Sequence, residues 1–158
     1  MLKLPKTIKM VITDFDGIIT DNFVYINDDY TMTRRVNFQD IIGINNLYKN
    51  GIELAIISGE SNPVIDILKN KFKLEEVHTK IHNKIDVMKD IIDRHSLSPD
   101  EYIYIGDDIN DLECLKYAKY KLTVPHAVDT VKAVENIQIT EKQSGFGAFR
   151  EVSDCLIN

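Results

Sequence analysis

MVITDFDG, at residues 10–17, combines a short apolar run with two carboxylates one residue apart. The run is typical of a buried strand, and Asp14 and Asp16 follow at its end. A strand that ends in this way can present both carboxylates at the mouth of an α/β sheet, where Mg²⁺ and a phosphate could bind. Asp is also common in ordinary turns after a strand. The motif therefore indicates function only together with other parts of the chain.

Further apolar segments alternate with helical patterns along the chain. Buried strands are expected at residues 9–13, 52–57, 102–105 and 121–124, with weaker ones at 76–78 and 136–139. Apolar residues at helical spacing predict helices around residues 41–48, 64–72, 85–92, 112–118 and 149–156. Strands that alternate with helices predict an α/β fold, with a doubly wound parallel sheet.

Composition limits the class of protein. The length of 158 residues suits one domain, residues 1–158, with a core of its own. The net charge of −6 argues against nucleic-acid binding. No apolar run approaches the ~20 residues that span a membrane, and no secretory signal is visible, so a cytoplasmic protein without membrane contact is expected. Cys114 and Cys155 are expected to be reduced thiols.

Residues 22–38 interrupt the alternation of strands and helices. Phe23–Ile26 and Tyr30–Thr33 flank Asn27-Asp28-Asp29, which predicts a β-hairpin around an Asn/Asp turn. Because it directly follows the first motif, this hairpin is expected to hang over the mouth of the sheet as a flap. Its aromatic residues suggest that another subunit covers it. A plain excursion of the sheet is the equal alternative.

Three later segments add groups that suit a phosphate. Ser58 follows a predicted strand and could hold a phosphate oxygen at a helix start, although a plain N-cap is the alternative. Lys84 begins a helix, where a cation is unfavourable for the helix dipole and needs another explanation. Asp107, Asp108 and Asp111 again follow a strand, and Gly106 before them permits close approach of the backbone.

Together, these four segments resemble the motif set of the haloacid dehalogenase superfamily of phosphohydrolases, over nearly the whole chain. The resemblance implies that Asp14 is the nucleophile and that Asp16 protonates the leaving group and then activates water. It implies that Ser58 and Lys84 bind phosphoryl oxygens. Asp107, the Asp14 carboxylate and the Asp16 backbone carbonyl would hold Mg²⁺. A carboxylate nucleophile beside a metal and a lysine is chemically coherent, and oxygen ligands suit Mg²⁺.

The same resemblance implies supporting roles for two further acids of the last motif. Asp111 would be a partner of Lys84 or of the water network around the metal. Asp108 would either share that role or begin a helix.

Within the superfamily, the chain is similar to a small subfamily without a large cap domain, which dephosphorylates 3-deoxy-2-ulosonic acid phosphates. These are KDO 8-phosphate, KDN 9-phosphate and N-acetylneuraminate 9-phosphate. The likeness rests on residues 16–21, the hairpin, residues 37–44 and a Gly-rich tail within about residues 143–158. It implies a homotetramer in which the flaps pack together and a neighbour completes the site.

Two departures from the subfamily pattern affect the choice of substrate. Gln39 stands where Arg is common, and Glu60 stands where the KDO 8-phosphate enzymes typically have Arg and the KDN 9-phosphate type has Glu. Glu60 would accept hydrogen bonds from sugar hydroxyls or an amide and would repel a carboxylate. A nine-carbon substrate is therefore favoured. The expected substrate-binding residues are Thr20, Asp40, Gly59, Glu60, Lys71, Gly147 and Arg150, with Lys71 or Arg150 as the compensating cation.

Two other functions remain open from the sequence. One is a non-catalytic oligomerisation module of a sugar-nucleotide synthesis system, since relatives of this fold occur in that role. The presence of Asp14, Asp16, Ser58, Lys84 and Asp107 counts against it. The other is a phosphatase for another small sugar phosphate, which a panel of substrates would distinguish.

Overall fold

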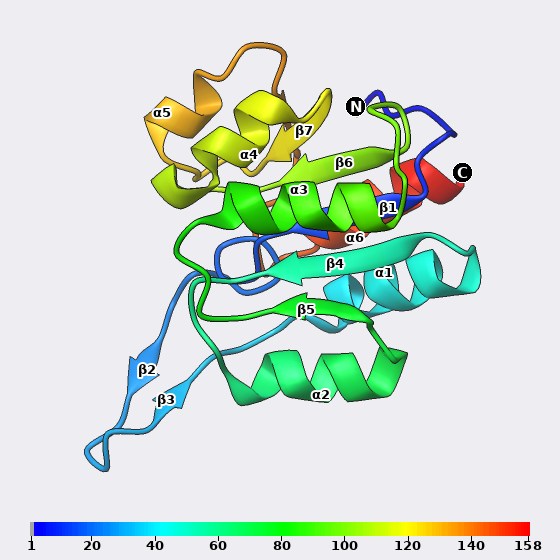
Figure 1. Ribbon diagram of the computed structural model, residues 1–158. Helices are drawn as coiled ribbons and strands as arrows, with labels where there is room; N and C mark the ends of the chain where they lie inside the picture. Colours follow the sequence, from blue (N-terminus) through cyan, green and yellow to red (C-terminus); the bar gives the residue numbers. More distant parts are fainter. Residues whose placement is uncertain (1) are drawn as a thin grey trace.

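Short parallel strands form the centre of the molecule (Figure 1). The computed structural model describes residues 2–158, and in this range one sheet has the order β5-β4-β1-β6-β7-β8. Its strands are β1 (Met10–Thr13), β4 (Glu53–Ile57), β5 (Glu76–His78), β6 (Tyr102–Ile105), β7 (Tyr120–Thr123) and β8 (Gln138–Ile139). The pairs are parallel, so the carboxyl ends of the strands lie along one edge.

Strand β1 lies in the middle of the sheet because its side chains are apolar on both faces. Val11 pairs with Leu54 of β4 and with Ile103 of β6. Val11 and Ile12 are fully buried. A strand covered on both faces needs such a continuous apolar run, and β1 therefore holds Asp14 and Asp16 at the centre of the carboxyl edge.

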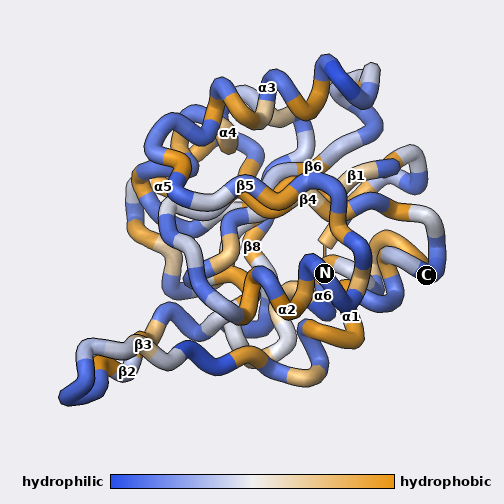
Figure 2. Tube along the Cα trace, turned by 60° about the horizontal axis from the view of Figure 1, so that its bottom comes forward, coloured by the Kyte–Doolittle hydropathy of each residue, from blue (hydrophilic) through white to orange (hydrophobic). Residues whose placement is uncertain are grey.

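Helices cover both faces of the sheet. Helices α1 (Phe38–Lys49), α2 (Pro63–Phe72) and α6 (Ala148–Ile157) lie on one face, and α3 (Lys84–Arg94) and α4 (Leu112–Tyr117) lie on the other (Figure 2). The short helix α5 (Asp129–Lys132) and the 3₁₀ turn η1 (Ile109–Asp111) lie beside α4. This arrangement confirms the predicted doubly wound fold without a large cap domain. The four-residue α5 was not predicted, because so short a helix has no periodicity to detect.

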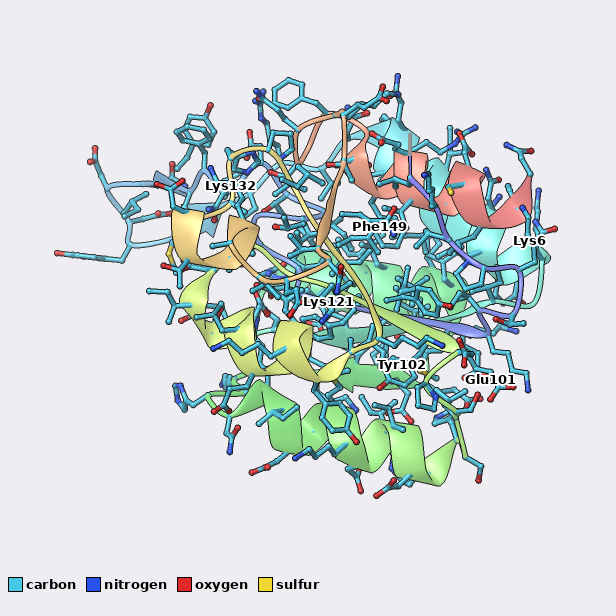
Figure 3. The ribbon with its side chains drawn as sticks, turned by 90° about the horizontal axis from the view of Figure 1, so that it is seen from above. Lys6, Glu101, Tyr102, Lys121, Lys132 and Phe149 are labelled. Atoms are coloured by element: carbon cyan, nitrogen blue, oxygen red, sulfur yellow. The ribbon has the colours of Figure 1, made fainter. Side chains whose placement is uncertain are left out.

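The C-terminal helix α6 packs against α1. The buried side chain of Asp40 in α1 accepts hydrogen bonds from the backbone N–H groups of Gly147 and Arg150, each at 3.0 Å. Ser153 donates to the carbonyl of Gly43 at 2.9 Å. At the other end of α6, Lys6 Nζ donates to the carbonyl of Leu156 at 3.3 Å, and Figure 3 shows Lys6 beside this helix end. The tail is thus an integral layer of the fold.

The hairpin has shorter strands than the sequence suggests. Strands β2 (Tyr25–Ile26) and β3 (Met32–Thr33) pair with Ile26 opposite Met32. The prediction that the second arm begins at Tyr30 is wrong. Tyr30 has a positive φ of 65° and lies in the turn, which the hydrogen bond from Asn27 N to Thr31 O closes at 2.9 Å.

The hairpin also lies differently from the expectation that it hangs over the mouth of the sheet. Its tip projects away from the body of the domain (Figure 1). Tyr25, Ile26 and Tyr30 are 61%, 75% and 92% exposed, so nothing within the described chain covers its apolar side chains. Without such contacts the tip has no reason to fold back over the sheet.

No helix in residues 2–158 has the length and apolar character needed to cross a bilayer.

Candidate active site

The carboxyl ends of the three central strands meet at a small cavity of about 150 Å³. Asp14 follows β1, Ser58 follows β4 and Asp107 follows β6. The cavity is lined by Asp14, Asp16, Asn22, Ser58, Gly59, Glu60, Asp107, Asp108 and Asn110. A larger cavity of about 320 Å³ lies beyond the opposite ends of the strands, between α1 and α2. Three glutamates line the larger one, and the buried Glu76 among them is already paired with Arg94. Asp14 and Asp107, which lie close enough together to share a cation, line the smaller one, so the chemistry points to the smaller.

Lys84 lies under this cavity as a buried cation. It is the first residue of α3, where it is only 1% exposed. Its Nζ atom is 2.9 Å from Asp14 Oδ2 and 2.8 Å from Asp111 Oδ1. Burial alone would disfavour the ammonium, but the charges of Asp111 and Asp14 raise the pKa of Lys84 overall. The two carboxylate partners therefore explain why a cation is stable at the start of this helix.

Asp111 organises the loop after β6. Its Oδ1 atom accepts hydrogen bonds from Lys84 and from the buried Tyr104 hydroxyl, at 2.8 and 2.7 Å. Its Oδ2 atom accepts from the backbone N–H of Asp107 at 3.1 Å. A Cβ atom on Gly106 would lie 2.4 Å from Asp111 Cγ, so only glycine leaves room for this carboxylate. Asp111 thus ties Lys84 to the backbone that presents Asp107.

Negative charge exceeds positive charge in this cluster. Oxygen atoms of Asp14, Asp107 and Asp111 all lie within 4.8 Å of one another, beside the single ammonium of Lys84. Burial, followed by the charge of Asp111, raises the pKa of Asp14 to about 7. Burial, followed by the charges of Asp14 and Asp111, raises the pKa of Asp107 to about 8. The cluster therefore favours an added cation.

Asp107 has features of a ligand held ready for a metal. Its Oδ1 atom is buried and makes no hydrogen bond within the described residues. A Cβ atom at Gly17 would lie 2.1 Å from Asp107 Oδ2, so the glycine makes the space that this carboxylate occupies. The donors gathered here are oxygen atoms, which suit a hard divalent cation such as Mg²⁺. Asp14, Asp107 and the backbone carbonyl of Asp16 are the groups that fit this role.

Asp16 is held by two side chains of the flap base and the loop before it. Arg34 Nε lies 3.0 and 3.1 Å from the two carboxylate oxygens. Thr20 Oγ1 donates to Asp16 Oδ1 at 3.0 Å. An isolated bridge between Thr20 and Val36 closes the base of the hairpin and brings Arg34 to this place.

The other predicted substrate residues fall into two groups. Ser58, Gly59 and Glu60 line the cavity, and Ser58 is almost fully buried. Lys71 lies exposed on α2, with its Nζ atom 5.4 Å from the centre of the Phe72 ring, and does not line the cavity.

Asp40, Gly147 and Arg150 belong to the contact between α1 and α6 and do not line the cavity either. The Nε atom of Arg150 is paired with Asp154 at 2.6 Å. Asp108 caps the turn η1, as one of its two predicted alternatives requires. The functional roles assigned to these residues from the resemblance stay predictions.

Several residues at the site were not singled out from the sequence. Arg34 and Tyr104 contact catalytic candidates, and Asn22 and Asn110 line the cavity. Arg34 is 18 positions from Asp16, a spacing that no helix or strand period brings together. The one available signal was the hairpin itself, since a hairpin returns its second arm to the residues that precede it.

Comparison with known proteins agrees with this geometry. The model of the haloacid dehalogenase-like hydrolase family matches residues 20–148. The chain belongs to this family. Among curated haloacid dehalogenase-like relatives, 3-deoxy-D-manno-octulosonate 8-phosphate phosphatase KdsC of Escherichia coli (strain K12) is 24% identical over 152 residues, covering 96% of this chain and 80% of the relative. KdsC of Haemophilus influenzae is 28% identical over 158 residues, covering 96% and 84%.

A solved structure gives the same family and fold. The 3-deoxy-D-manno-octulosonate 8-phosphate phosphatase from Moraxella catarrhalis, in complex with magnesium ion, phosphate ion and KDO, superposes with a TM-score of 0.89. It is 30% identical, and the match covers 96% of this chain and 87% of that one. The predicted resemblance to cap-less haloacid dehalogenase phosphatases is confirmed, and so is the prediction of a hydrolytic enzyme.

Proposed function

We propose that this protein is a Mg²⁺-dependent phosphatase that removes phosphate from a 3-deoxy-2-ulosonic acid phosphate through an aspartyl-phosphate intermediate. The observation that supports it most is the buried cluster of Asp14, Asp107, Asp111 and Lys84 at the cavity. The magnesium, phosphate and KDO held by the Moraxella relative support the same chemistry. When bound, Mg²⁺ would neutralise the excess carboxylate charge and the charge of the phosphate.

In the first half of the reaction, Asp14 attacks phosphorus. A bond forms between an Asp14 oxygen and phosphorus, and the bond from phosphorus to the ester oxygen breaks with its electron pair. Asp16 in its acid form gives a proton to the leaving alkoxide. Lys84, 2.9 Å from Asp14, would bind a phosphoryl oxygen together with the Ser58 hydroxyl at the cavity wall. This positions the phosphoryl group in line with the nucleophile.

In the second half, water replaces the enzyme on phosphorus. Asp16 as a carboxylate takes a proton from the water as its oxygen attacks. The bond between phosphorus and Asp14 breaks, its electron pair returns to the Asp14 carboxylate, and inorganic phosphate leaves. Two steps through a carboxylate ester replace one difficult displacement by water.

Glu60 supports a nine-carbon substrate, KDN 9-phosphate or N-acetylneuraminate 9-phosphate, within this class. It lines the cavity next to Gly59 and can accept hydrogen bonds from sugar hydroxyls or an amide. The names of the relatives support KDO 8-phosphate instead. A substrate panel separates these members of the class, and it also tests another small sugar phosphate.

The exposed hairpin supports a homotetramer as the working form. Phe23, Tyr25, Ile26 and Tyr30 place more than half of their surface in solvent. Contiguous exposed apolar side chains of this kind are typical of protein interfaces. The proposed partner is a set of identical chains whose flaps pack together. The cytoplasmic location stays a prediction.

The test is phosphate release from KDN 9-phosphate, N-acetylneuraminate 9-phosphate, KDO 8-phosphate and glucose 6-phosphate, with Mg²⁺ and with EDTA. Asp14→Asn serves as the blank, because it removes the nucleophilic charge and keeps the shape. Metal-dependent release from an ulosonic acid phosphate, absent in the blank, supports the proposal. Preference for KDO 8-phosphate contradicts the Glu60 argument alone. A folded wild-type protein that releases no more phosphate than the blank favours the oligomerisation module.

A further inference from the structure

Asn22 lines the catalytic cavity beside Asp14 and Asp16, but the proposed chemistry does not use it. Its backbone has a positive φ of 66°. Glycine adopts this left-handed conformation most readily, and asparagine does so more readily than most other residues. The side chain is exposed, and within residues 2–158 its amide has no hydrogen-bond partner. The amide is therefore available to a molecule bound in the cavity.

The residues on both sides of Asn22 fix its backbone. The hydroxyl of the buried Thr20 accepts a hydrogen bond from the backbone N–H of Asn22 at 3.4 Å. The buried Asp21 pairs with Arg35, which follows β3 in the second arm of the flap. Gly145 lies against Asp21 so closely that a Cβ atom on this glycine would be 2.6 Å from Asp21 Cβ. These contacts hold the Asn22 side chain at the edge of the cavity.

The same contacts place Asn22 next to Asp16. The Thr20 hydroxyl that accepts from Asn22 also donates to Asp16 Oδ1, at 3.0 Å. In the proposed reaction, Asp16 protonates the leaving oxygen. That oxygen lies roughly opposite the attacking Asp14 oxygen, because the displacement at phosphorus is in line. A side chain that borders Asp16 is therefore well placed to contact the leaving group.

The size of the cavity limits the part of the leaving group that Asn22 can reach. Its volume of about 150 Å³ lies below the ~300–1,000 Å³ of a typical small-molecule site. It can hold the phosphoryl group and the nearest carbons of a sugar acid, and the rest must extend beyond it. In all three candidate ulosonic acid phosphates, the carbon next to the phosphate-bearing carbon carries a hydroxyl group. An amide can both donate a hydrogen bond to a hydroxyl and accept one from it.

We propose that Asn22 is a specificity-determining residue that forms a hydrogen bond with this hydroxyl group. The inference rests on the proposed function and names the part of the substrate that the start of the flap recognises. The contact favours esters that carry a hydroxyl next to the phosphate-bearing carbon. An ester without that hydroxyl, such as p-nitrophenyl phosphate, leaves the amide without a partner in the complex and gains nothing from it.

The experiment compares Asn22→Gly with the wild type. Glycine accepts a positive φ without strain, so the variant loses the amide and keeps the backbone. The kcat/KM values are measured with Mg²⁺ for p-nitrophenyl phosphate and for the ulosonic acid phosphate that the wild type hydrolyses fastest. We expect kcat/KM for the ulosonic acid phosphate to fall by about three- to tenfold, the usual effect of one lost hydrogen bond. The value for p-nitrophenyl phosphate should stay within about twofold of the wild type.

Asn136→Gly is the matched control. Asn136 is also exposed and has a positive φ of 60°, but it lies before β8 and does not line the cavity. This variant should keep both kcat/KM values, and thermal unfolding checks that both variants fold.

Two results would overturn the inference and leave the proposed function intact. One is a loss of less than twofold for the ulosonic acid phosphate in Asn22→Gly. The other is an equal loss for both substrates, which would place Asn22 at the phosphoryl group. A wild-type protein that hydrolyses only p-nitrophenyl phosphate overturns the proposed substrate class, and one that hydrolyses neither substrate overturns the proposed phosphatase. In both of these cases the role of Asn22 is overturned as well.

Discussion

Two clusters of charged side chains, near opposite ends of the parallel strands, balance their charges differently. At the beginning of β5, the buried Glu76 accepts two hydrogen bonds from Arg94, at 2.5 and 3.0 Å, and pairs with His78 and His95 at 2.7 and 2.8 Å. At the carboxyl edge, three acids share the one ammonium of Lys84. In the first cluster the buried carboxylate of Glu76 contacts one guanidinium and two imidazoles, and the second cluster leaves buried carboxylates in excess.

For this reason the pKa values of the acids in the two clusters depart from their ordinary values in opposite directions. Hydrogen bonds from Arg94 above all, and from His78 and His95, hold the pKa of Glu76 well below its usual range. Burial and mutual repulsion raise the pKa values of Asp14 and Asp107 to about 7 and about 8. A carboxylate that is paired with donors, in a balanced cluster, stabilises the fold. Carboxylates that repel one another, in an unbalanced cluster, favour the binding of a cation. We therefore expect Glu76 to be a structural acid, and Asp14 and Asp107 to be functional ones.

Among the variants of the two clusters, we predict the largest loss of turnover for Asp107→Asn. Loss of this carboxylate removes a proposed metal ligand from the unbalanced cluster, so turnover should fall by about a thousandfold or more at moderate Mg²⁺. Titration of activity with Mg²⁺ should show a weaker apparent affinity. The control is Asp129→Asn, at an acid whose side chain is 99% exposed, which should leave both values unchanged. If the Asp107→Asn enzyme kept the wild-type dependence on Mg²⁺, Asp107 would not be a metal ligand.

Glu76→Gln should mainly reduce stability. The change weakens the pairing with Arg94, His78 and His95, and loss of a largely buried, charged hydrogen-bond partner costs about 2–3 kcal/mol. Urea unfolding measures this loss, and kcat of the folded variant should be retained. Glu75→Gln, at the exposed neighbour, should stay within about 0.5 kcal/mol of the wild type. Lost turnover in a fully stable Glu76→Gln protein would show that the balanced cluster is also functional.

The pH dependence of stability should distinguish the two clusters by sign. Raised pKa values mean that folded Asp14 and Asp107 bind protons more tightly than the unfolded chain does. In EDTA, the free energy of unfolding should therefore fall as pH rises from about 4 to about 8, by at least about 1.4 kcal/mol, the equivalent of one pKa unit. Mg²⁺ should flatten this slope because it binds the ionised carboxylates.

The Glu76 cluster should act in the opposite way and at lower pH. Its contribution is present above the ordinary glutamate pKa and is lost as pH falls further. Urea unfolding between pH 3 and 9, with Mg²⁺ and with EDTA, measures both effects, and Asp107→Asn is the control that should reduce the upper slope. A metal-free protein whose stability rises steadily from pH 5 to pH 8 would contradict the assignment of the unbalanced cluster.

Local sequence was enough to predict the strands and the placement of Asp14, Ser58 and Asp107 at the carboxyl edge. The run Met10–Thr13 is mostly apolar and is buried on both faces, so its central place and the position of Asp14 follow from burial. Lys84 at a helix start was also recognisable, because a cation is unfavourable there and needs another explanation. These features depend on neighbours in sequence and on the common direction of parallel strands.

Features that depend on long-range packing were not predictable in the same way. The ion pair of Arg34 with Asp16 exists only because the hairpin closes between Thr20 and Val36. The direction of the flap depends on contacts that its apolar side chains lack within the described chain. Asp40 illustrates the limit, since its sequence neighbours resemble a substrate-binding segment and its side chain contacts the backbone of α6.

Asp40 has a consequence for the order in which the protein can mature during synthesis. Its carboxyl group is fully buried in the finished domain, and burial raises its pKa. The carboxylate accepts its hydrogen bonds from the N–H groups of Gly147 and Arg150. These two residues are synthesised more than 100 residues after Asp40. Until they arrive, this face of α1 must stay hydrated, because an unpaired buried carboxylate is costly. The nascent chain therefore cannot bury this face of α1 before the segment that contains Gly147 and Arg150 has emerged.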